Sequence, residues 1–191
     1  MDKVIELFSD KIIRCFLNQD IIDETQKDVY QYGIIVASQA AITMISMLII
    51  GLIFGLFFEN LCFMIVFKIL RKFSGGLHSK KFSICFSVSI VLNFLILFVY
   101  RFFVLNPCFL IIIPIELVSS ILLLFFSPIK NANKDISKNA LRIYKYIVAI
   151  ICVFVMALSI VLVLNRSIYA YFICMAILLD SIFVVLGHIK N

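Results

Sequence analysis

The sequence predicts an all-α, polytopic membrane helix bundle of about six membrane segments, preceded by an N-terminal amphipathic helix. Hydrophobic residues make up 64% of the 191 residues and charged residues only 15%. Typical soluble domains contain about 45–50% and about 25% of these classes. The apolar runs are long and continuous, and in lipid the backbone polar groups must be satisfied within helices or a closed barrel. Because the runs do not alternate as barrel strands do, we expect helices.

Residues 1–32 are expected to form a cytoplasmic or interfacial region. In residues 1–17 apolar side chains recur at helical spacing and charged side chains fill the other face. This pattern is typical of an amphipathic helix on the bilayer surface or against the bundle. Residues 33–191 are predicted to form the transmembrane bundle, so that 1–191 make a single integral-membrane domain.

Six apolar runs define the expected membrane segments. They cover residues 33–58, 61–70, 82–105, 108–126, 143–164 and 168–189, with Glu59-Asn60 as a polar break after the first. About 20 apolar residues cross a bilayer, so the second run is too short by itself. Either the first span ends early, near Gly51 or Gly55, and a second helix runs on to Leu70, or 61–70 is a re-entrant or steeply tilted segment.

The basic residues predict the orientation in the membrane. Five Lys or Arg residues lie in 68–81 and four in 129–142, whereas the turns at 106–107 and 165–167 contain one Arg at most. Segments rich in Lys and Arg stay on the cytoplasmic side. Both termini and the 71–85 loop are therefore expected in the cytoplasm, on a protein of the plasma membrane. The net charge of +6 is attributed to this orientation and not to nucleic-acid binding.

The six cysteines are scattered along the chain, and no pair has CxxC spacing. Neither a disulfide framework nor a metal site is therefore expected, and no cofactor is predicted. Most of the cysteines lie in or beside apolar runs, where a thiol packs as a small hydrophobe. These are Cys62, Cys108, Cys152 and Cys174.

The polar island 71–85 holds the residue types that chemistry would need. A cysteine attacks as its thiolate, and a nearby imidazole can take the thiol proton, which makes Cys85 and His78 the candidate catalytic pair. Along one straight helix their separation of seven residues is a rise of about 10.5 Å, too far for a hydrogen bond. A loop at Gly75-Gly76 is therefore expected to fold His78 back over the start of the next helix.

The same island carries a family resemblance. Arg71, the run Ser74-Gly75-Gly76-Leu77-His78 and Cys85 at the start of a span resemble the signature of the accessory gene regulator B (AgrB) family. The resemblance covers nearly the whole chain, including its length, its amphipathic N-terminus and the basic loop after a Ser-Pro near residue 128. It implies a membrane cysteine endopeptidase of Gram-positive quorum sensing, with Cys85 as nucleophile and His78 as its base.

The resemblance also implies a substrate. Family members cut a short signal-peptide precursor near its C-terminus through a cysteine thioester, and some then close a thiolactone or lactone. The precursor's tail is acidic, and the island offers six residues to hold it: Arg71, Lys72, Gly75, Gly76, Lys80 and Lys81. Membrane anchoring is the alternative role for the basic ones. Lys80, Lys81 and the helix start would also favour the Cys85 thiolate. A homodimer in the lipid bilayer is expected.

Two other classes of function stay open. A small transporter or exporter of a signal peptide would use Glu116 and Asp180, which lie within predicted spans. Acids in such positions are costly and usually face the bundle interior, where structural pairing is their simpler role. A purely structural membrane scaffold would leave the Gly-Gly-His and Cys85 arrangement unexplained.

Overall fold

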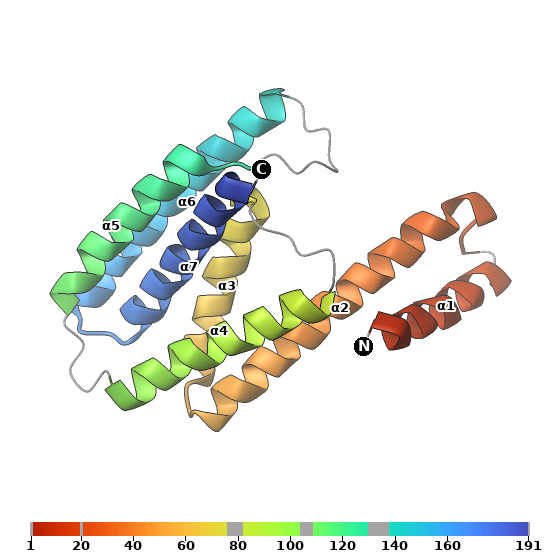
Figure 1. Ribbon diagram of the computed structural model, residues 1–191, viewed down its shortest axis with the longest axis horizontal. Helices are drawn as coiled ribbons and strands as arrows, with labels where there is room; N and C mark the ends of the chain where they lie inside the picture. Colours follow the sequence, from red (N-terminus) through yellow and green to blue (C-terminus); the bar gives the residue numbers. More distant parts are fainter. Residues whose placement is uncertain (1, 20, 76–81, 104–108, 130–137, 191) are drawn as a thin grey trace. The chain divides into compact units, whose positions relative to one another are not determined.

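The computed structural model describes residues 2–19, 21–75, 82–103, 109–129 and 138–190 (Figure 1). The helices are α1 (Asp2–Asn18), η1 (Glu24–Gln26, a 3-10 turn), α2 (Lys27–Ile53), α3 (Phe57–Ser74), α4 (Phe82–Phe103), α5 (Phe109–Phe126), α6 (Lys138–Leu164) and α7 (Tyr169–Lys190). The described residues contain no strand. The predicted all-α fold class is confirmed.

The helices have the composition and the surface of membrane segments. By length and hydropathy α2, α4, α6 and α7 are able to cross a bilayer, and α5 is a shorter apolar helix. Large apolar side chains face outward, as at Val153 and Phe154 of α6, which are 70% and 68% exposed. Serines, two asparagines and two acids are buried instead. Apolar outside and polar inside is the arrangement that lipid selects, and the chain is a multi-pass membrane protein.

The first predicted span, 33–58, ends too late and is corrected by the structure. Helix α2 ends at Ile53, and a turn follows in which Gly55 has a φ of 68° and the Leu56 N–H donates to the Gly51 carbonyl at 2.9 Å. The run 61–70 is the middle of α3, so the first of the two alternatives was right. The polar pair 59–60 lies in the first turn of α3 and does not interrupt the helix, because an acid near a helix N-terminus is favourable. The turn between α2 and α3 is made by Gly55 instead.

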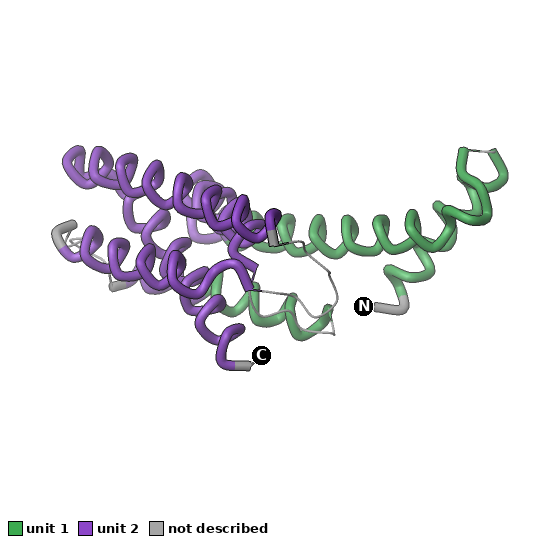
Figure 2. The backbone as a smooth tube through the Cα atoms, turned by 90° about the horizontal axis from the view of Figure 1, so that it is seen from above, with its two compact units in different colours: residues 1–50, 79–94 green, residues 51–78, 95–191 purple. Residues whose placement is uncertain are grey.

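The described residues fall into two compact units (Figure 2). Unit 1 comprises residues 1–50 and 79–94. In it α1 runs back along α2 (Figure 1), and the Gln31 amide donates to Asp10 Oδ1 at 2.6 Å. Helix α1 buries Ile5 and Ile13 and exposes Leu7. The predicted amphipathic helix is therefore present, with only part of its apolar face packed on the protein, since Val4 and Phe8 are also exposed.

Unit 2 comprises residues 51–78 and 95–191 and is built around α7. Helix α7 packs against α3, α5 and α6, and α6 also contacts α3 and α5. Helices α6 and α7 are antiparallel, joined by a short turn at Arg166, which has a φ of 50°. The apolar core of the unit consists of Leu70, Leu123, Ile129, Val148, Cys152, Val155, Ile173, Ile177 and Val184.

Candidate functional site

Cys85 is the fourth residue of α4, and its thiol is free and exposed. This position, about one turn into the helix, agrees with the place that the sequence predicts for Cys85. Of the five described cysteines, Cys15 is also exposed, Cys62 is partly buried, and Cys152 and Cys174 are buried. Among those five, only Cys15 on α1 and Cys85 on α4 are exposed enough to react.

Several other predicted site residues fall outside the described part of the chain. These are Gly76, His78, Lys80 and Lys81. Lys72 is exposed in the last turn of α3, with its Nζ 5.5 Å from the ring centroid of Phe73. It is therefore available to an acidic ligand, whereas Arg71 and Gly75 are engaged within unit 2.

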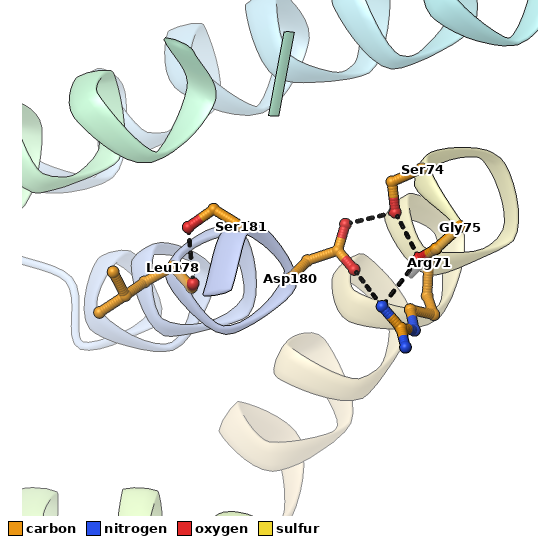
Figure 3. Close-up of polar contacts among 6 residues, drawn as sticks. All are labelled: Arg71, Ser74, Gly75, Leu178, Asp180 and Ser181. Atoms are coloured by element: carbon orange, nitrogen blue, oxygen red, sulfur yellow. Dashed lines mark hydrogen bonds and ion pairs between the residues drawn. The ribbon is translucent and has the colours of Figure 1, made fainter. Parts of the chain in front are cut away.

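The end of α3 is joined to α7 by a buried polar cluster, which we call the α3–α7 clasp and define as Arg71, Ser74, Gly75 and Asp180 (Figure 3). The Ser74 hydroxyl donates to Asp180 Oδ2 at 2.7 Å. Arg71 Nη1 lies 3.7 Å from Asp180 Oδ1 and donates to the Gly75 carbonyl at 2.7 Å. The Asp180 side chain is 0% exposed and that of Arg71 is 18% exposed. The buried acid thus has a charge partner and a hydroxyl donor.

The clasp also accounts for the peptide groups at the end of α3. The last carbonyls of a helix lack intrahelical partners. The Ile129 N–H, from the segment after α5, donates to the Ser74 carbonyl at 3.1 Å. Arg71 Nη1 donates to the Gly75 carbonyl. Gly75 itself has a φ of 76° and a ψ of −147°, a conformation open essentially to glycine alone. A Cβ there would lie 3.1 Å from the Ile129 carbonyl oxygen.

Sequence reasoning identified Asp180 and Arg71 separately but not as partners. Pairing was the simpler role considered for Asp180, and the structure has that pairing. Ser74 was noted only as part of the motif. The sequence does contain a feature that suggests this pairing. An acid within a span, such as Asp180, needs a hydrogen-bond donor or a cation, and Arg71 lies at the end of another apolar helix. Choosing that partner required knowing that α3 packs against α7. Substrate binding by Arg71 stays a prediction.

Glu116 on α5 is in a different state from Asp180. It is 1% exposed, and neither of its carboxylate oxygens has a hydrogen-bond partner among the described residues. Ser159 of α6 faces this carboxyl. Its hydroxyl, like that of Ser120 on α5, is also buried without a partner in the described structure. Two acids predicted on equal grounds are therefore distinguished by their surroundings.

Comparison with known proteins identifies relatives of this chain. The family model described as accessory gene regulator B matches residues 9–184. An AgrB-like protein 2 of Clostridium perfringens strain 13 is 32% identical over 154 residues, covering 76% of this chain and 72% of the relative. An AgrB-like protein of Clostridium perfringens strain SM101 is 34% identical over 152 residues, covering 75% and 71%. No solved structure matches.

Proposed function

Because the chain belongs to the accessory gene regulator B family, we propose that it is a membrane-embedded cysteine endopeptidase that cleaves a quorum-sensing signal-peptide precursor. Family membership supports a role in the accessory gene regulator quorum-sensing system. The observation that carries the proposal is the free, exposed thiol of Cys85 in the first turn of α4. A thiol in that position has the access and the favourable helix end that a nucleophile needs.

The proposed chemistry begins with a proton transfer. The His78 imidazole takes the thiol proton, and the Cys85 sulfur attacks the scissile carbonyl carbon of the precursor. The tetrahedral intermediate collapses by breaking the C–N bond. The C-terminal fragment leaves as an amine with the proton from the imidazolium, and the N-terminal part stays as a thioester on Cys85.

The thioester is resolved in one of two ways. Water hydrolyses it to a linear acid, or a Cys or Ser side chain of the precursor attacks it and closes a thiolactone or lactone. In both cases the leaving sulfur recovers a proton as the Cys85 thiol. A thioester retains the activation of the acyl group, so ring closure competes well where water is kept out, and a site at the bilayer surface favours that.

The precursor's acidic tail is proposed to lie against the basic residues of the island. Lys72 supports this assignment because it lies in the island and its side chain is exposed in the last turn of α3. Lys80 and Lys81 are proposed as its companions, and Gly76 as a position that admits the peptide backbone closely. We further propose that this site faces the cytoplasm and that the protein works as a homodimer in the plasma membrane.

The test uses purified protein in liposomes and the peptide encoded by a short neighbouring gene, with an amphipathic N-terminus, a central Cys or Ser and an acidic tail. Cys85→Ala and His78→Ala are expected to abolish cleavage, and mass spectrometry of the wild type is expected to detect a covalent precursor adduct on the Cys85 peptide. Cys15→Ala is the matched control, since it removes the other exposed described thiol, and it should cleave normally. Full cleavage by Cys85→Ala would disprove the assignment.

A further inference from the structure

Four basic side chains are exposed at one end of unit 2. Lys68 and Lys72 lie in the last two turns of α3, and Arg142 and Lys145 lie near the start of α6. We call these four residues the basic band. Within the described residues none of the four forms an ion pair. Their charges are therefore available to a ligand from outside the chain.

A ring contact places three residues of the basic band at one level. Phe73 of α3 packs edge-on against Tyr144 of α6, with ring centroids 5.8 Å apart. Lys72 directly precedes Phe73. Arg142 and Lys145 are within two residues of Tyr144. Because a helix rises about 1.5 Å per residue, the three backbones lie within about 3 Å of this ring contact, measured along their helix axes. The basic band is therefore shared by two packed helices.

The acids of unit 2 do not balance this charge. Of the three that the structure describes, Glu116 and Asp180 are buried, and Glu59 lies in the first turn of α3. Glu59 and Lys72 are separated along α3 by a rise of about 20 Å. This distance exceeds the Debye length of about 8 Å at physiological ionic strength, so their attraction is largely screened. Within the described chain the basic band is thus uncompensated.

Exposed apolar surface continues from the basic band on both helices. On α3, the exposed side chains of Ile65 and Ile69 lie on the same face as Lys72, because residues three, four and seven apart share a helix face. On α6, Tyr146 follows Arg142 by one turn and is 71% exposed, and exposed apolar side chains follow it. Aromatic residues of this kind are typical of the level at which lipid headgroups begin. The surface therefore passes from cationic to apolar along the helices, as the two parts of an anionic lipid require.

From this arrangement we infer that the basic band binds the phosphate headgroup of an anionic phospholipid, whose acyl chains lie along the exposed apolar faces of α3 and α6. The ammonium and guanidinium groups supply the charge and the hydrogen-bond donors that a phosphate accepts. An acidic peptide would neutralise the band but leave the apolar faces uncovered. A zwitterionic phospholipid would cover the faces but bring no net charge. The inference requires neither the proposed cleavage nor the proposed orientation.

The test measures lipid preference by native mass spectrometry of the purified full chain. The protein is taken from mixed micelles that contain equal amounts of phosphatidylglycerol and phosphatidylcholine with the same acyl chains. The variant is Arg142→Gln with Lys145→Gln, which leaves Lys72 in place because that residue is also proposed to hold the precursor. The matched control is Arg101→Gln with Arg166→Gln, which removes the same charge from exposed positions of unit 2 outside the band.

We expect the wild type to retain phosphatidylglycerol in preference to phosphatidylcholine. The Arg142→Gln and Lys145→Gln double variant should lose this preference on the order of 25-fold, since each basic residue near an anionic surface contributes about fivefold. Salt at about 1 M should reduce the wild-type preference as well, because it shortens the Debye length to about 3 Å. The control double variant should keep the wild-type preference.

Three results would overturn the inference. One is a wild-type preference in the band variant, and another is an equal loss in the control variant, which would indicate diffuse attraction by net charge alone. The third comes from a short polyglutamate peptide: if the band variant loses binding of this peptide but keeps its lipid preference, the band recognises an acidic peptide. Should the double variant not fold, Lys145→Gln alone decides, with an expected loss of about fivefold, and a wild-type preference in it overturns the inference.

Discussion

At the scale of residues, two buried acids show how environment assigns different roles to the same chemistry. Asp180 has a cation and a hydroxyl donor, both from α3. Glu116 is buried to the same degree, and its oxygens have no hydrogen-bond partner within the described residues. A buried polar group without a partner costs about 1–3 kcal/mol, whereas breaking a buried ion pair leaves an uncompensated charge behind.

Substitution of these acids by apolar residues should therefore have opposite effects. Glu116→Met keeps the side-chain length and removes an unpartnered group, so we expect a gain of about 1–3 kcal/mol and a higher Tm in detergent. Asp180→Leu leaves Arg71 without its carboxylate and should lower the Tm. Thermal unfolding of the two purified variants beside the wild type checks this. A loss of stability in Glu116→Met would mean that its carboxyl has a partner in the membrane.

At the scale of elements, α3 is bounded by two glycines with positive φ. Gly55 precedes it with a φ of 68° and open space around the position of a Cβ, and Gly75 ends it with a φ of 76° against the Ile129 backbone. The first makes a turn between helices, and the second ends α3 within the 71–85 island. The length of α3 is therefore determined by backbone conformation and not by where its apolar residues stop.

Alanine at these two glycines should separate backbone strain from crowding. Gly55→Ala is expected to cost about 1–2 kcal/mol, the strain of a positive φ alone. Gly75→Ala should cost more, because its backbone conformation is essentially confined to glycine and its Cβ would also displace Ile129. Thermal unfolding of both variants measures the difference. Equal losses would show that the Ile129 segment yields freely to the new methyl group.

At the scale of the whole molecule, several polar side chains are buried although many large apolar side chains are exposed. Ser74, Asn93 and Ser159 are buried, while about half of the large apolar side chains on α6 are exposed. This reversal follows from the solvent: lipid accepts the apolar surface, and polar groups are satisfied only inside the bundle. Catalysis is proposed at the start of α4, where the Cys85 thiol is exposed.

The orientation predicted from the basic residues can be tested on one thiol. In right-side-out bacterial vesicles a membrane-impermeant maleimide should leave Cys85 unlabelled, and in inside-out vesicles it should label Cys85, because the positive-inside rule assigns the 71–85 island to the cytoplasm. A Cys15→Ala background removes the other exposed described thiol. Labelling from the outer face would reverse the proposed orientation.

The sequence by itself determined the class of the protein and most of its elements. Composition and run length alone require a helical membrane protein, because these properties depend on local hydropathy. The island around Gly75, His78 and Cys85 was likewise visible as a pattern of residue types. Local hydropathy placed the end of the first span too late. The turn at Gly55 lies inside the apolar run 33–58, and a turn made by glycine does not change the hydropathy of such a run.

Only the tertiary structure decided which residues act together. Asp180 and Ser74 are 106 residues apart, and the local sequence around each residue does not identify the other as its partner. Their contact exists because α3 packs against α7, and that packing results from side chains throughout unit 2. Partner choice for a buried charge is a property of the whole bundle, whereas helix formation is a property of each segment. For that reason the sequence predicted the catalytic pair as a hypothesis, whereas the pairing of Asp180 with Ser74 and Arg71 is visible only in the fold.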